Sequence, residues 1–133
     1  RRTILGLDQN RVARLAAGME KKLGMHLMGH DIFMNVAGGI KVGEPAVDLG
    51  IVAALASSFL DKALPEGTIV LGEVGLTGEV RAISHVENRV AETQKMGFTR
   101  CIVPAGSLKR MKVPAGLRAV GVRTISEAVE TLF

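Results

Sequence analysis

The chain has 133 residues, of which 47% are hydrophobic, and carries a formal net charge of +4. This length fits one globular domain, whose core must be aliphatic because the sequence has no Trp or Tyr and only 4 Phe. So few aromatic side chains argue against base-stacking platforms, and the lone Cys101 excludes a disulfide framework or a cysteine-rich zinc site within the chain.

A first helix is predicted from Asp8 to about Leu23. Asp8 is a suitable N-cap, and Gly24 would end the helix. One stripe of the helix is apolar and consists of Val12, Leu15, Ala16, Met19 and Leu23. We therefore expect this helix to pack one face on the core.

A strand and a nearly all-apolar helix follow. Residues 31–36 alternate as a strand does and lead to Gly38-Gly39, after which residues 40–42 can continue in an extended conformation. The helix is predicted from about Pro45 to Asp61. Because it is apolar nearly all round, we expect it to be the buried central helix.

The middle of the chain predicts a hairpin and a third helix. Residues 68–74 read as a strand, and a turn at 75–78 leads into a second strand at 79–83. Ser84 and Glu87 have the spacing of a capping box, which predicts a helix from about His85 to Met96.

The last third predicts two more strands and a helix. Residues 100–103 read as a buried strand that ends at Pro104, and residues 117–122 as another short strand. A second capping box at 124–127 predicts a last helix ending near Phe133. Helices and strands interleave throughout, so the expected fold is a single α/β domain with a mixed sheet packed against helices.

The expected cellular location is inferred from the lack of membrane-spanning and signal-peptide patterns in the sequence. No stretch approaches the roughly 18 uninterrupted apolar residues of a membrane span, and no signal-peptide core follows Arg1-Arg2. Together with the lone cysteine, this predicts a cytoplasmic protein without a membrane partner. An initial arginine in place of methionine indicates a fragment of a longer chain.

Charge is unevenly distributed along the sequence. Residues 1–66 hold 8 cationic and 7 acidic residues, whereas residues 67–133 hold 9 and 6. The stretch from Thr93 to Ser126 contains no acidic residue, and its cationic residues are Lys95, Arg100, Lys109, Arg110, Lys112, Arg118 and Arg123. It is either a polyanion-binding surface or a solvated face balanced by acids elsewhere, and charge alone leaves both open.

The segment Gly43 to Gly50 is built as a site for a nucleophile and lacks one. Proline is favourable in the first turn of a helix, where free N–H groups stabilise developing negative charge. A hydroxyl or thiol at position 46 would be activated there. Ala46 offers neither.

This segment, with Val36-Ala37-Gly38-Gly39 before it and residues 72–80 after it, resembles the proteolytic domain of Lon proteases over nearly the whole chain. The resemblance implies a Lon-like α/β fold. In that family a serine from the helix-opening loop and a lysine from the helix after the second glycine-rich hairpin catalyse peptide hydrolysis. The serine falls on Ala46 and the lysine on Arg89, which stays protonated. The resemblance therefore implies a pseudo-peptidase without catalytic residues.

A closer resemblance is to the RadA (Sms) family of bacterial recombination ATPases, whose C-terminal domain is Lon-like. Residues 6–12, 35–39, 44–49 and 72–80 carry it. It implies that residues 1–133 are the Lon-like domain of a longer protein, with a zinc finger and a RecA-like ATPase domain upstream. ATP, Mg and Zn are expected only in those upstream domains, and none in this chain. The implied partners are DNA, further copies of the chain in a homo-hexamer, and the upstream RecA-like motor domain.

Two other ligand classes find no support in the residues. His26 and His30 have His-x-x-x-His spacing and Asp31 follows, but a loop around Gly24 and Gly29 without a third strong ligand predicts no metal site. No Gly-x-x-x-x-Gly-Lys-Ser/Thr loop occurs, so we expect no ATP binding by the usual route.

The function implied is an oligomerisation and sequence-independent DNA-binding platform for a branch-migration ATPase. Phosphate contacts require cations rather than base-reading geometry. The candidate DNA-binding residues are Arg1, Arg2, Lys62, Arg81, Arg89, Arg100, Lys109, Arg110 and Lys112. A plain linker explains Arg1 and Arg2 equally well, and Lys62 also suits the end of a helix dipole. The alternatives are a purely structural hexamerisation scaffold and a peptide-binding pseudoprotease.

Overall fold

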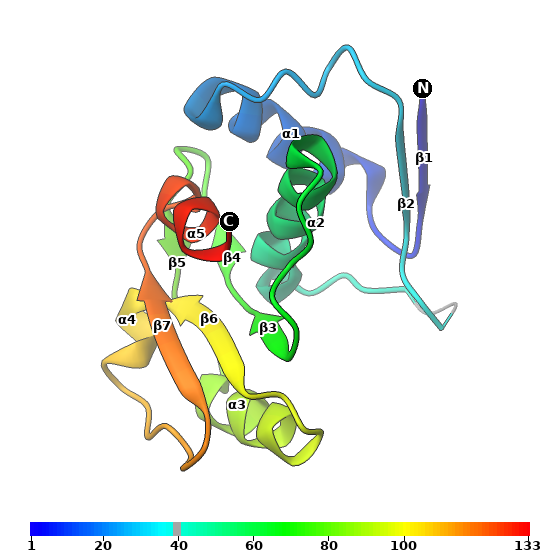
Figure 1. Ribbon diagram of the computed structural model, residues 1–133. Helices are drawn as coiled ribbons and strands as arrows, with labels where there is room; N and C mark the ends of the chain where they lie inside the picture. Colours follow the sequence, from blue (N-terminus) through cyan, green and yellow to red (C-terminus); the bar gives the residue numbers. More distant parts are fainter. Residues whose placement is uncertain (39–40) are drawn as a thin grey trace.

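The computed structural model describes residues 1–38 and 41–133, and Figure 1 shows helices and strands interspersed along them. The elements in chain order are β1 (Arg2–Leu5), α1 (Gln9–Leu23), β2 (Ile32–Asn35), η1 (Pro45–Val47), α2 (Asp48–Leu60), β3 (Thr68–Val70), β4 (Glu73–Val74), β5 (Val80–Arg81), α3 (Val86–Lys95), β6 (Arg100–Pro104), α4 (Ala105–Leu108), β7 (Arg118–Val122) and α5 (Ile125–Leu132). The predicted α/β class is confirmed. Gly39 and Ile40, which belong to the predicted glycine pair and extended segment, lie outside the described residues.

The strands form separate parallel and antiparallel sheets. β1 pairs with β2 in parallel, β3, β6 and β7 form a parallel sheet in the order β3-β6-β7, and β4 pairs with β5 antiparallel. Figure 1 shows α2 between the β1–β2 pair and the rest of the molecule. Both strand directions occur as predicted, but among the described residues they are divided between sheets.

Two apolar clusters hold these layers together. The larger one joins α1, α2 and α5 to one face of the three-stranded sheet and includes Met19, Leu49 and Ile102, each fully buried. The smaller one lies on the opposite face, where Val90 of α3 packs with Cys101 and its neighbours. Burial raises the pKa of the Cys101 thiol, so this residue is a small core side chain, as its apolar sequence context indicates.

Local signals predicted the ends of α1 and α5 correctly. The carboxylate of Asp8 accepts a hydrogen bond from the N–H of Asn10, and Gly24 ends α1 in the left-handed conformation with φ of 67°. At α5, the hydroxyl oxygen of Thr124 accepts a hydrogen bond at 3.1 Å from the N–H of Glu127. The predicted capping residues therefore fix both helices in place.

The capping box predicted for α3 does not form. His85 occupies the N-cap position with φ of 55°, and it makes no side-chain capping bond. The side chain of Glu87 instead accepts a hydrogen bond at 2.9 Å from the backbone N–H of Lys112. A contact with a distant loop thus replaced the local one that the spacing predicted.

Two strand predictions need correction. Residues 68–74 do not form one strand, because β3 ends at Val70 and β4 begins at Glu73 in a different sheet. Gly72 lies between them against the start of α2, where its N–H donates to the carbonyl of Ala46 and its carbonyl accepts from Leu49. A Cβ at Gly72 would lie 3.0 Å from a methyl carbon of Val80 and 3.3 Å from one of Leu49, so a larger residue here would require these side chains to shift. The second correction is β1, which was not predicted.

The central helix is less enclosed than its composition predicts. It begins with the single 3₁₀ turn η1 and continues as α2, most of which is buried. One stripe near its C-terminal end is exposed, including Ala54, Ser58 and Phe59. This stripe faces β2 across a groove.

Candidate functional site

The loop before α2 holds Ala46 in a closed position. Pro45 occupies the first turn of η1, as predicted, and Ala46 is only 5% exposed. The carbonyl of Ala46 accepts a hydrogen bond at 3.0 Å from the N–H of Gly72. The position expected for a nucleophile therefore carries a buried methyl group that is held against the glycine-rich segment.

Arg89 reaches this loop from α3. Its guanidinium forms an ion pair with the carboxylate of Glu44, and its Nε donates to the carbonyl oxygen of Ser84 at 2.9 Å. The hydrogen bond from Arg89 lowers the pKa of Glu44, and the same contact raises the pKa of Arg89. An ion pair thus connects the two segments that the resemblance brings together, and its cation is already neutralised by a carboxylate.

A buried ionic cluster lies one turn further along, and sequence reasoning missed it. Asp48, the first residue of α2, has a side chain only 1% exposed. It forms ion pairs with Arg11 and, at 3.6 Å, with Arg14, and it accepts a hydrogen bond at 3.1 Å from the N–H of Val74. One carboxylate therefore joins α2 to α1 and β4. The available signal was a lone acid at the start of an otherwise apolar helix.

The hairpin after β4 is ordered by Glu79. Its carboxylate accepts hydrogen bonds from the hydroxyl of Thr77 at 2.8 Å and from the N–H of Thr77 at 3.0 Å. The Thr77 hydroxyl, the backbone N–H groups of Glu79 and Thr77, and Arg81 together lower the pKa of Glu79 from 4.5 to about 2. Arg81 lies 3.2 Å from this carboxylate. The candidate DNA contact at Arg81 is therefore partly neutralised within the chain.

Other candidate cations are also engaged. Nη2 of Arg100 donates to the carbonyl of Thr131 at 3.3 Å, so this candidate side chain is tied to the end of α5. Arg2 donates to the carbonyl oxygens of His30 and Leu27. The guanidinium of Arg1 lies 5.6 Å from the ring centroid of Phe33. Arg1 and Arg2 are thus part of the β1–β2 edge rather than a linker.

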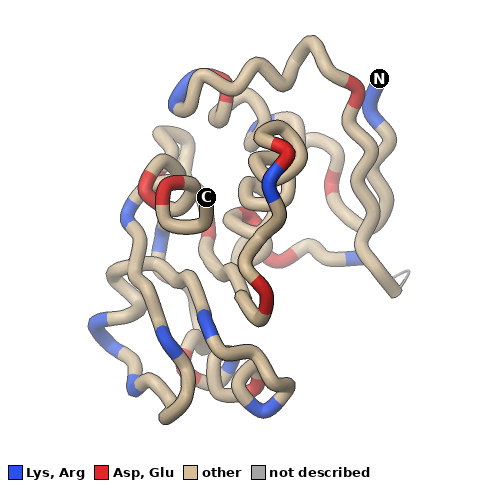
Figure 2. Tube along the Cα trace, in the orientation of Figure 1, with Lys and Arg blue, Asp and Glu red and all other residues tan. Residues whose placement is uncertain are grey.

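The remaining candidates project into solvent. Lys109, Arg110 and Lys112 follow α4, and all three are exposed, as is Lys62 beyond α2. In the described ranges 1–38 and 41–133, none of these four side chains forms an ion pair. Figure 2 shows Lys and Arg positions gathered on β6, α4 and β7, with the Asp and Glu positions of that region on α3 and α5. The cationic stretch of the sequence is therefore a continuous region of the fold.

The histidines do not converge on a common ligand. His26 contacts Glu20 at 3.1 Å, and the His30 ring meets Phe59 edge-on with centroids 5.9 Å apart. Across the part of the chain that the structure describes, no three His, Cys, Asp or Glu side chains come together as a metal site would need.

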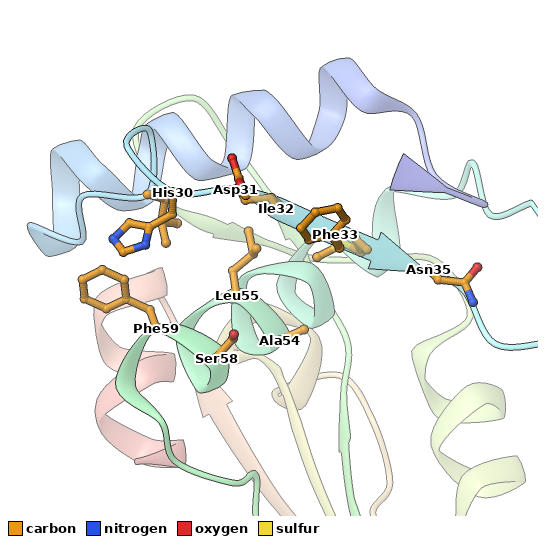
Figure 3. Close-up of a pocket in the computed structure, with 11 residues that line it drawn as sticks. His30, Asp31, Ile32, Phe33, Asn35, Ala54, Leu55, Ser58 and Phe59 are labelled. Carbon is orange, nitrogen blue, oxygen red and sulfur yellow. The ribbon is translucent and has the colours of Figure 1, made fainter. Parts of the chain in front are cut away.

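A groove of about 600 Å³ lies between β2 and the exposed stripe of α2 (Figure 3). Phe33, Leu55 and Phe59 contribute apolar surface, and His30 and Ser58 contribute polar groups. None of the predicted site residues lines it.

None of the helices in the described ranges is long and apolar enough to cross a bilayer.

A family model described as subunit ChlI of Mg-chelatase matches residues 3–107. The chain belongs to this family. It is also 47% identical to DNA repair protein RadA of Bacillus subtilis (strain 168) over 131 residues, which are 98% of this chain and 29% of that protein. It is 44% identical to DNA repair protein RadA of Halalkalibacterium halodurans over 98% of this chain and 28% of that protein. It is 41% identical to DNA repair protein RadA of Streptococcus pyogenes serotype M6 over 100% of this chain and 29% of that protein.

These matches confirm the predicted resemblance to RadA. The chain spans less than a third of the length of these curated relatives. The residues that they share with it therefore form one part of a larger protein in each relative.

Proposed function

We propose that this domain is a non-catalytic, Lon-like platform for self-association and sequence-independent DNA binding in a RadA-type DNA repair and recombination ATPase. The observation that carries the proposal is the cationic loop after α4, formed by Lys109, Arg110 and Lys112. All three are exposed, and none forms an ion pair within the described residues. Unpaired cations on one region provide the phosphate contacts that non-specific DNA binding requires.

The absence of peptide hydrolysis is part of the proposal. A serine–lysine mechanism needs a nucleophile and a base that can accept its proton. Ala46 has no such group, and Arg89 remains protonated in its ion pair with Glu44. The geometry supports a structural role for this pair, which closes the entrance loop of α2 against α3.

The relatives are named DNA repair proteins, which supports the repair role. The match covers less than a third of each relative, so the rest of such a protein is long enough to contain an ATPase domain. We place the ATP-, Mg- and Zn-dependent functions in such upstream domains. In this arrangement the domain would join subunits, as a homo-hexamer, and position DNA relative to the RecA-like motor. It would take no cofactor itself.

Fluorescence anisotropy with a labelled duplex tests the DNA role. We expect binding at low salt that weakens steeply as salt rises, because phosphate contacts release condensed counterions. Two duplexes of unrelated sequence should bind equally well. An isolated chain that leaves the anisotropy unchanged at low salt would contradict DNA binding, and a defined oligomer by light scattering would then favour the scaffold alternative.

A second candidate function is the binding of an extended polypeptide in the groove of Figure 3. The N–H of Ile32 donates to the carbonyl of Arg1, just before β1, at 2.8 Å, and the N–H of Val36 donates to the carbonyl of Leu5 in β1 at 3.0 Å. Because backbone groups alternate along a strand, those of Phe33 and Asn35 point away from β1. Within residues 1–38 and 41–133, no other strand pairs with this edge of β2. An unpaired strand edge beside an apolar wall suits strand addition.

Binding of an unfolded, labelled polypeptide distinguishes the second candidate. Ser58→Arg should block the groove and abolish saturable binding, whereas Ala17→Arg on the exposed face of α1 serves as the matched control. If both variants bind like the parent chain, the groove is not a peptide site. The groove lies beside β2 and α2, so this test does not depend on the Ala46–Arg89 region.

A further inference from the structure

Three polar residues lie side by side at the start of the three-stranded sheet. Thr68 of β3 is in register with Arg100 of β6, and Arg100 is in register with Arg118 of β7. Residues in register on neighbouring parallel strands are about 4.8 Å apart and project to the same face of the sheet. Figure 2 shows cationic positions next to one another on β6 and β7.

The core composition identifies that face. Two residues further along each strand, Val70, Ile102 and Val120 pack in the apolar cluster formed with α2 and α5. Thr68, Arg100 and Arg118 therefore point to the same side, at the sheet end below α5. The hydrogen bond from Arg100 to the Thr131 carbonyl agrees with this placement.

The three residues offer hydrogen-bond donors without matching acceptors. Nε of Arg100 and Oγ1 of Thr68 are both buried and have no hydrogen-bond partner. Neither Arg100 nor Arg118 forms an ion pair with a carboxylate of the described residues. Like charges at adjacent strand positions repel each other, and a buried donor without an acceptor is unfavourable. Both features are relieved by one ligand that is an anion and accepts several hydrogen bonds.

We propose that Arg100, Arg118 and Thr68 form a binding site for a phosphate group. Guanidinium groups match the oxygens of phosphate in geometry and charge, and a hydroxyl donates to a third oxygen. The proposal rests on the proposed function for the source of the group, which is the DNA backbone. It adds Arg118 and Thr68 to the candidate contacts and gives Arg100 a role beyond its contact with α5.

Inorganic phosphate and a labelled DNA duplex are the two probes. Nuclear magnetic resonance on the 133-residue chain follows the Nε–H signal of Arg100 and the amide of Thr68 at millimolar phosphate, with sodium chloride of equal ionic strength as the reference. Arg118→Gln removes one exposed cation of the site. Arg123→Gln removes an exposed cation just beyond the other end of β7 and is the matched control.

We expect phosphate to shift both signals saturably in the parent chain and in Arg123→Gln, but not in Arg118→Gln. With DNA, Arg118→Gln should reduce the slope of log affinity against log salt by about 0.9, the value of one phosphate contact. If Arg118→Gln abolishes phosphate binding but leaves the affinity for DNA unchanged, the result supports the site and identifies free phosphate as its ligand.

Signals that respond equally to phosphate and chloride would overturn the site, even if the chain binds DNA. Saturable phosphate binding in a chain that does not bind DNA would instead overturn the proposed function and leave the site intact. Thr68→Val provides an independent check, because it keeps the shape of the side chain, removes only the hydroxyl and should weaken phosphate binding.

Discussion

Replacing Asp48 by alanine is expected to lower the free energy of unfolding by about 3–5 kcal/mol, the usual effect of breaking a buried ion pair. The substitution would leave Arg11, whose side chain is only 19% exposed, without its carboxylate. It would also leave the N–H of Val74 without its acceptor. Because these groups come from α1 and β4, the loss would loosen the contacts of both with α2.

Urea denaturation measures this effect, provided that the slope of the unfolding free energy against urea concentration is the same in the variant and in the parent chain. Asp48→Asn retains an acceptor for Val74 and should be less destabilising than alanine. Glu92→Gln is the control, since Glu92 and Lys95 form an exposed pair at 3.9 Å that is worth at most about 1 kcal/mol. A midpoint for Asp48→Ala that coincides with the control would show that the cluster does not hold the three elements together.

The sequence predicted the elements whose determinants are local. Asp8 and Gly24 define α1 through contacts within a few residues, and Thr124 does the same for α5. By contrast, β1 exists because it pairs with β2, and Arg2 aligns with Ile32 thirty residues later. No local pattern reports such a pairing. The division of residues 68–74 between two sheets has the same origin.

The candidate site was predicted in outline but not in its contacts. The resemblance placed the family's serine at position 46 and its lysine at position 89, and the structure joins the two segments through Glu44. The sequence did not indicate that Glu44 would be the partner, because nothing in its spacing relates it to a helix 45 residues away. Counting charges also could not distinguish Arg81, which is paired with Glu79, from Lys109, which projects freely into solvent. Exposure and pairing are properties of the fold.

The variant in which Lys109, Arg110 and Lys112 are all replaced by alanine should bind DNA markedly more weakly and with less dependence on salt. If each side chain contacts one phosphate, the slope of log affinity against log salt falls by about 2.7, three times the value of a single contact. Folding should be preserved, because the hydrogen bond between this loop and Glu87 uses the backbone N–H of Lys112 rather than its side chain.

Anisotropy titrations at several salt concentrations measure that slope, and circular dichroism verifies the fold. The matched control replaces the exposed Lys21, Lys22 and Lys41, which lie on α1 and before η1, and removes the same formal charge. If charge alone determines affinity, the two triple variants weaken binding equally, and the loop after α4 is then no specific surface. If the first variant loses more, the phosphates lie against the loop that follows α4. Because Glu44 already neutralises Arg89, we expect the region around Ala46 and Arg89 to contribute less to DNA binding than this loop.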